Sequence, residues 1–248
     1  MKAGKSIVSR LFSVVLVMSL AFAAVPETTQ TTYAKSTITA YLTVSDGGDI
    51  LETKSGDDAV RLSVKLTGQS SYTVGDLFTA AHKQYCSKGK NGYTTEYSSD
   101  YDSYSVTKFW GITTNYNCGY YVNNTMASGL SDTISSGDDV SFFIYEGSYY
   151  DGTLENYSYF TKKTATVKNK KVTLTLKQLS YDESYNLVSS AVSGAKIIVN
   201  GKSVSYKTNK NGKVTIKFKK AGTYIISAKK KSSGLSVITA PYCVVKVK

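Results

Sequence analysis

The strongest constraint on the fold is a period-two alternation of apolar and polar residues, which recurs in short runs. Residues 61–66 alternate leucine or valine with polar side chains, and residues 171–179 largely repeat the pattern. Successive side chains of a strand point to opposite faces, so this alternation predicts strands with one buried face. We therefore expect a mostly β protein.

The first 34 residues have the pattern of a secretory signal peptide. A basic start precedes an apolar run over residues 11–25, which is shorter than the ~20 residues of a membrane-spanning helix. We expect cleavage after Ala34, or alternatively after Ala23, and a secreted or extracellular protein. Association with the cell wall is compatible with that location, and an uncleaved anchor is the alternative. No second apolar run of that length follows, so no transmembrane segment is expected after cleavage.

One segment has apolar residues at helical spacing. Thr73 and Asp76 have the spacing of a capping box, and an apolar stripe from Leu77 to Tyr85 follows them. This predicts a helix that ends near Ser87. His82, the only histidine, lies in this segment without metal-ligand spacing around it, and we expect it at the surface or rim.

The N-terminal half resembles a known module. Residues 37–147 resemble the β-grasp-like modules of unknown function related to the C-terminal domain of transcobalamin, through phrases at 72–78, 118–124 and 134–145. The resemblance implies an α+β domain over residues 35–150, with one helix on a mixed sheet. In vitamin-binding members this domain forms one side of a corrinoid site. Cobalamin is therefore an alternative ligand, although Asn124 stands where the family usually has Gly.

The C-terminal half has short alternating runs separated by turn signals, which predicts an all-β immunoglobulin (Ig)-like sandwich over residues 163–248. It resembles bacterial Ig-like or prealbumin-like modules, through the turn at 208–213 and the Ala-Gly-Thr-Tyr phrase that ends at Tyr224. Gly212 should take a positive φ, and the Tyr224 hydroxyl should tie a strand corner. Residues 151–162 are expected to be a linker.

Charge divides the chain after its first 34 residues. Residues 35–160 contain 8 Lys and Arg against 15 Asp and Glu, a net −7, whereas residues 161–248 contain 19 Lys against 2 acids, a net +17. Outside a cell the anionic partners would be wall polymers, acidic glycans or membrane surfaces, and nucleic acid is not expected. The alternative is a solvated lysine surface that only maintains solubility.

Tyrosine is unusually frequent, with 21 residues against a single Trp. A tyrosine ring offers a large contact area at low entropy cost and carries a hydroxyl, so it suits glycan or protein ligands. Of two adjacent tyrosines at 120 and 121, the one that faces inward should belong to the core. The candidate ligand-binding residues are Trp110, Tyr116, Tyr120, Tyr121, Tyr149 and Tyr150.

Catalytic and metal motifs are missing from the sequence. It has one His, no Gly-x-Ser-x-Gly, no phosphate-binding Gly loop and no Cys/His metal spacing, so no enzyme, metal site or cofactor is expected. Of the three cysteines, Cys86 and Cys118 can form a disulfide in an exported chain, and three separate buried thiols are the alternative. We therefore expect a secreted or cell-surface, non-enzymatic binding or adhesion protein for a glycan or protein. The alternatives are a corrinoid or other small-ligand carrier and a structural spacer.

Overall fold

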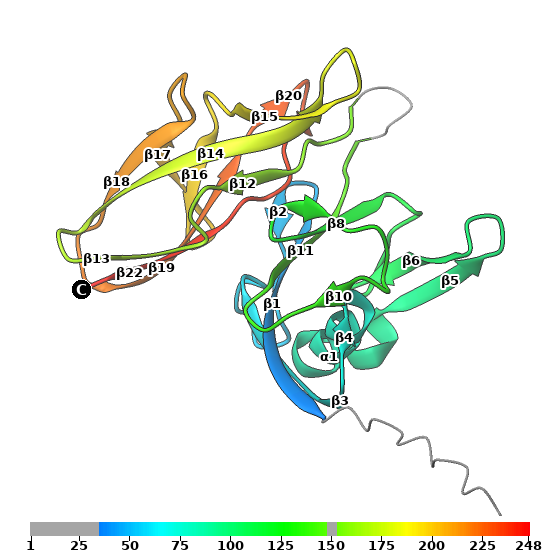
Figure 1. Cartoon of the computed structure of the whole chain (residues 1–248). Coiled ribbons are helices and arrows are strands. Elements are labelled where there is room, and N and C mark those ends of the chain that lie inside the picture. The colour runs from blue at the N-terminus through cyan, green and yellow to red at the C-terminus, as the bar shows by residue number, and fades with distance from the viewer. Residues whose placement is uncertain (1–34, 148–152) are drawn as a thin grey trace, which may run out of the picture. The chain divides into compact units, whose positions relative to one another are not determined.

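The computed structural model describes residues 35–147 and 153–248 (Figure 1). The described chain is mostly β, with one α-helix and a short 3-10 helix. This confirms the predicted fold class. The predicted signal peptide, Tyr149 and Tyr150 lie outside the described residues.

A mixed sheet organises the N-terminal half. Its two central strands, the first and the last of this half, are parallel, whereas the flanking pairs are antiparallel. The strands in spatial order are β3 (Leu62–Gln69), β1 (Ser36–Asp46), β11 (Asp139–Ile144), β8 (Cys118–Val122) and β9 (Thr125–Met126), with β2 (Asp49–Ile50) beside the end of β1. A hairpin, a helix and a central parallel pair form the predicted β-grasp-like arrangement.

The helix α1 (Val74–Tyr85) begins at the predicted capping box. The Thr73 hydroxyl oxygen accepts the Asp76 N–H at 3.3 Å, and the Asp76 carboxylate accepts the Thr73 N–H at 2.9 Å. Before it, β4 (Tyr72–Thr73) pairs with β10 (Thr133–Ile134). The reciprocal bonds satisfy backbone donors that a helix start leaves unpaired.

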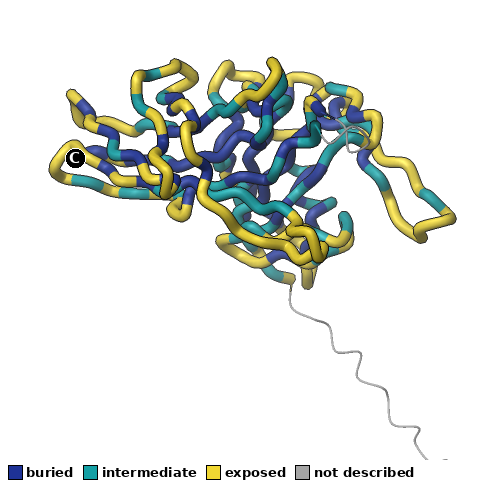
Figure 2. Tube along the Cα trace, turned by 90° about the horizontal axis from the view of Figure 1, so that it is seen from above, coloured by how far each residue is buried: buried dark blue, intermediate teal, exposed yellow. Residues whose placement is uncertain are grey.

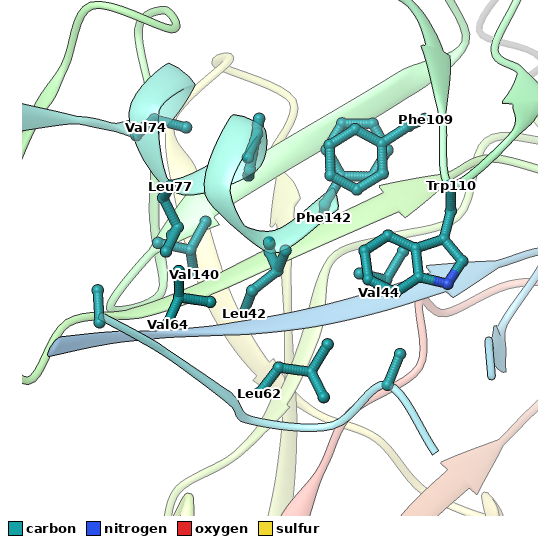
Figure 3. Close-up of a cluster of buried hydrophobic side chains, with 14 of the residues drawn as sticks. Leu42, Val44, Leu62, Val64, Val74, Leu77, Phe109, Trp110, Val140 and Phe142 are labelled. Atoms are coloured by element: carbon teal, nitrogen blue, oxygen red, sulfur yellow. The ribbon is translucent and has the colours of Figure 1, made fainter. Parts of the chain in front are cut away.

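The apolar stripe of α1 packs on the sheet and forms the first hydrophobic core (Figure 3). Phe78, at the centre of the stripe, meets Phe109 and Phe142 edge-on, and those two rings stack with centroids 3.5 Å apart. Between the helix and β8, the chain forms η1 (Gly89–Gly92), β5 (Thr94–Ser98), β6 (Ser103–Phe109) and β7 (Ile112–Thr113). The C-terminal end of β6, at Phe109, therefore lies in the core, while its N-terminal end, at Ser103, lies outside it.

Two sheets enclose a second core in the C-terminal half. One contains β12 (Ser158–Phe160), β14 (Lys171–Tyr181), β15 (Leu187–Ala191) and β18 (Lys213–Lys217). The other contains, in order, β13 (Thr164–Val167), β22 (Cys243–Val247), β19 (Gly222–Lys229), β16 (Lys196–Val199) and β17 (Lys202–Lys207). A short pair, β20 (Lys231–Ser232) and β21 (Leu235–Ser236), lies near the end. This arrangement is the predicted Ig-like sandwich.

Two turns that carried the Ig-like resemblance have the expected roles. Gly212 has a φ of +69°, and a Cβ atom there would overlap the Leu176 carbonyl oxygen. The Asn209 side-chain oxygen accepts the Asn211 and Lys213 N–H groups. The Tyr224 hydroxyl donates to the Lys220 carbonyl at 2.9 Å, the strand-corner bond that tyrosine makes in Ig-like sandwiches.

Residues 156–160, within the predicted linker, are part of the folded structure. They contain β12, which pairs with β14, and Ser158 donates two hydrogen bonds to Thr239, one from its N–H and one from its hydroxyl. Tyr157 is buried in a small cluster with Tyr121 and Phe143. Its ring stacks on that of Tyr121, with the two centroids 3.8 Å apart. The division into two domains stays a prediction, since the described residues form one unit.

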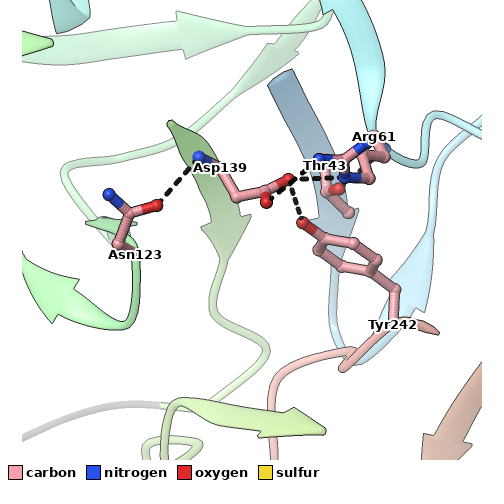
Figure 4. A network of polar contacts seen from close by, with 5 residues as sticks. All are labelled: Thr43, Arg61, Asn123, Asp139 and Tyr242. Atoms are coloured by element: carbon pink, nitrogen blue, oxygen red, sulfur yellow. Dashed lines mark hydrogen bonds and ion pairs between the residues drawn. The ribbon is translucent and has the colours of Figure 1, made fainter. Parts of the chain in front are cut away.

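Asp139 connects strands of both halves (Figure 4). Its carboxylate lies 3.0 Å from the Arg61 Nε and accepts the Tyr242 hydroxyl at 2.8 Å. Its own N–H donates to the Asn123 side chain at 3.0 Å. Tyr242 is buried, and burial together with the Asp139 charge raises the pKa of its hydroxyl, which therefore stays a donor.

Candidate binding surface

The β5–β6 hairpin extends away from the first core. Tyr97 on β5 lies directly opposite Tyr104 on β6, and Asp102 in the turn has a φ of +45°. Figure 2 shows the hairpin as a projecting, mostly exposed loop of chain. Every residue of β5 is exposed or half-buried. In β6 only Val106 and Phe109 are buried in the core, so the outer part of the hairpin is free for contact.

Four tyrosines make this region aromatic, and we call them the tyrosine surface. Their residues are 51% (Tyr97), 82% (Tyr101), 58% (Tyr104) and 63% (Tyr116) exposed. Exposed aromatic residues gathered in this way are unusual on a soluble protein and mark interaction sites. The rings of Tyr97 and Tyr104 lie 5.3 Å apart, tilted by 58°.

Carboxylates hold two of the tyrosine hydroxyls in place. The Tyr97 hydroxyl donates to Asp102 at 2.7 Å, and the Tyr116 hydroxyl donates to Glu96. These hydrogen bonds raise the pKa of both phenols, so the rings stay neutral. The bonds also restrict ring rotation, which lowers the entropy cost of binding a ligand.

Two open depressions adjoin the hairpin. The larger, of about 460 Å³, is lined by residues of both strands and the turn and by Tyr116. The smaller, of about 210 Å³, lies beside Tyr104 and Tyr120. Ser105 and Tyr116 line both. The larger volume falls in the range of small-ligand sites.

The charge of the hairpin selects among ligands. Glu96, Asp100 and Asp102 lie on it, and no lysine occurs between residues 91 and 107. Repulsion between like charges disfavours acidic glycans here. The tyrosine surface thus suits an uncharged or basic ligand.

The three described tyrosines among the candidate ligand-binding residues lie in three different environments. Tyr116 belongs to the tyrosine surface. Tyr120 packs partly buried against Phe78 of the first core, whereas Tyr121 is buried on the opposite side of β8 beside Tyr157. The expectation that only one of the two adjacent tyrosines is in a core is therefore incomplete, because both faces of β8 are covered.

Trp110 is a core residue, so little of its ring is accessible, and a ligand contact there stays a prediction. It is only 8% exposed, and its indole N–H donates to the Glu52 carbonyl at 2.7 Å. With a φ of +55°, it begins the tight turn from β6 to β7. This turn directs the indole into the first core, beside Val44 (Figure 3).

His82 is buried, which corrects its predicted surface position. Its Nδ1 lies 2.7 Å from the Phe78 carbonyl, and its Nε2 accepts the Trp110 backbone N–H at 2.9 Å. An N–H facing the carbonyl and an acceptor facing Trp110 fix a neutral imidazole. Burial accordingly lowers the pKa of His82 to about 4.

The three cysteines are free thiols, so the disulfide between Cys86 and Cys118 is absent and the separate-thiol alternative describes the structure. Burial raises the pKa of Cys118 to about 11 and that of Cys243 to about 12. Thiols with such pKa values have little reactive thiolate at neutral pH. They act as small apolar side chains.

The sequence-based list of candidates missed Tyr97, Tyr101 and Tyr104. A signal for them exists, because residues 94–105 contain only polar residues and tyrosine. Strands that offer no apolar face cannot both lie on a core. That composition predicts a hairpin with both faces in solvent.

Within residues 35–147 and 153–248, no three His, Cys, Asp or Glu side chains gather in a way that could hold a metal ion. In the same part of the chain, no helix has the length and apolar character needed to cross a membrane.

Comparisons with known proteins give no family. No model of a known family matches the chain, and no curated protein matches it. The similarity to the transcobalamin-related modules therefore stays a prediction.

Among solved structures, the N-terminal four Ig domains of Dscam1 isoform 6.9 are 10% identical over 84% of this chain, with a TM-score of 0.25. The chain covers 44% of that structure's length. Fibronectin(III)-like modules of Clostridium thermocellum CbhA are 8% identical, with a TM-score of 0.26, over 86% of this chain and 94% of that one. Scores this low carry no argument, and the fold assignment rests on strand order and pairing.

Proposed function

We propose that this protein is an exported, non-enzymatic binding protein that recognises an uncharged extracellular glycan through the tyrosine surface. The observation that carries the proposal is the cluster of four exposed tyrosines on and beside a projecting hairpin. These four rings lie outside both cores, so the packing of the monomer does not need them. Ligand binding is the role their exposure favours.

The chemistry of the surface suits a sugar. The C–H groups of a sugar ring pack on a tyrosine face, and the sugar hydroxyls need nearby donors and acceptors. Serines 98, 99 and 105 and the Glu96 carboxylate line the larger depression with the aromatic rings. An acidic glycan would meet the hairpin carboxylates and is disfavoured.

A protein ligand is the second candidate. Tyrosine and serine dominate the hairpin, and this composition is typical of antibody paratopes. A corrinoid is less favoured, because the indole of the candidate contact Trp110 is buried.

Binding to a glycan array tests the proposal. We expect Tyr97→Ser/Tyr104→Ser to weaken binding at least tenfold, since truncating aromatic contact residues costs ~1–3 kcal/mol. The matched control is Tyr181→Ser/Tyr185→Ser, which removes two exposed tyrosines elsewhere. Equal affinity of both variants for the bound glycan would contradict the proposal. Binding only to a protein array would favour the second candidate.

A further inference from the structure

The outer face of β14 and β18 carries four lysines. Lys171 lies opposite Lys217, and Thr175 lies opposite Lys213. Residues opposite one another share a face of the sheet, and Lys177 follows on the same face by alternation. The residues between them point inward and form the second core. We call Lys171, Lys177, Lys213 and Lys217 the lysine face.

Among the described strands that pair with β14, no acid lies opposite a member of the lysine face. The only acids after residue 160 are Asp182 and Glu183, in the turn after β14. Asp182 is occupied by bonds from the N–H groups of Ser184 and Asn186. Among the described residues, no member of the lysine face forms an ion pair.

The opposed pair Lys171–Lys217 has an energetic cost. Like charges directly opposite on one sheet face destabilise the pairing. Both residues are exposed and neither belongs to the second core, so the core does not require ammonium groups there. A bound anion would remove this repulsion.

The type and placement of the cations indicate the kind of anion. All 19 basic residues after residue 160 are lysines. Lysine binds phosphate as a compact point charge, without the bidentate geometry by which the planar arginine fork binds carboxylate and phosphate. The distance from Lys171 to Lys177 along the strand is ~20 Å at ~3.4 Å per residue. Three threonines, Thr173, Thr175 and Thr215, lie between the lysines and offer hydroxyl donors.

An adjoining groove extends the positive surface. It has a volume of about 810 Å³, lies between β13 and the start of β14, and is lined by Lys162, Lys168 and Lys171 among others. Lys171 belongs to both the groove and the lysine face. An extended chain with several charges fits this continuous surface better than a single small anion.

We propose that the lysine face binds a linear phosphodiester polymer of the cell surface. The proposal is independent of the tyrosine surface. It uses a different half of the chain and an anionic ligand.

Binding of the full exported chain to immobilised poly(glycerol phosphate) at low and high salt tests the proposal. We expect Lys171→Gln/Lys177→Gln/Lys213→Gln/Lys217→Gln to weaken binding at least fiftyfold, since one basic residue near an anionic surface contributes about fivefold. The matched control replaces Lys196, Lys202, Lys207 and Lys231 by Gln. It removes the same charge and another opposed pair, Lys196–Lys207, and should change binding less than fivefold.

Three results would overturn the proposal: no binding by the wild type at low salt, equal losses in the two variants, or equally tight binding of poly-glutamate. If the fourfold variant fails to fold, Lys171→Gln alone should still cost about fivefold. Tyr97→Ser/Tyr104→Ser should bind the polymer as the wild type does, so failure of the glycan proposal leaves this result separate.

Discussion

His82 accepts the Trp110 N–H at a turn where the backbone has left the sheet ladder. Because Trp110 begins this turn with a positive φ, its N–H has no strand partner and points into the core. A neutral imidazole supplies the acceptor and is itself fixed by the Phe78 carbonyl. The only histidine of the chain therefore has a structural role, on the buried side of α1.

This burial predicts a pH dependence of stability. The unfolded chain binds a proton on His82 near pH 6.5, whereas the folded protein does so only near pH 4. The unfolded state binds more protons between these values, so the unfolding free energy rises with pH across this window. The contribution is fully present above pH 6.5 and is lost toward pH 4, at most about 3 kcal/mol.

Chemical denaturation of His82→Gln from pH 4 to 7 checks this prediction. The amide oxygen of Gln is still able to accept the Trp110 N–H but does not titrate, so the stability of the variant should change less with pH than that of the wild type. An unchanged slope would contradict the account.

Glu155 titrates in the opposite sense and provides the control. Burial raises its pKa to about 7 from 4.5, so its contribution to stability falls as pH rises through that interval. The variant Glu155→Gln should therefore change the profile in the opposite direction to His82→Gln.

At the scale of elements, the sequence predicted those features correctly that depend on a single turn or a single set of short-range hydrogen bonds. The capping box at Thr73, the positive φ of Gly212 and the Tyr224 corner are confirmed, because each depends on residues a few positions apart. The position of Trp110 could not be predicted in this way, because it depends on which side of a turn faces the core. His82 follows Phe78 by four residues, so the helical spacing itself places it on the buried side of α1, and the expected surface position overlooked this spacing.

The capping box gives a prediction for α1. Thr73→Ala leaves the Asp76 N–H without its acceptor and should lower the unfolding free energy by ~1 kcal/mol. Urea denaturation measures the loss, with Ser70→Ala, an exposed residue of the preceding turn, as the control. A loss no greater than that of the control would show that solvent satisfies this helix start.

At the scale of the whole molecule, the composition predicts that the two parts of the chain carry opposite charge. It does not predict on which surfaces the charged side chains lie. The sequence predicts a net −7 and +17 for the two parts of the chain. Only the strand register shows that Lys171, Lys213 and Lys217 share one face and that the acids near residue 100 share the tyrosine hairpin. Register depends on pairing between distant strands, which a single sequence does not determine.

The central claim is that the tyrosine surface is the ligand-binding site. The most direct test is an amide chemical-shift titration of the full exported chain with the neutral oligosaccharide that binds most tightly on the array. We predict that the shifts gather at residues 94–105 and at Tyr116, while β14 and β18 stay unchanged. Shifts confined to other residues, or none at saturating oligosaccharide, would contradict the account.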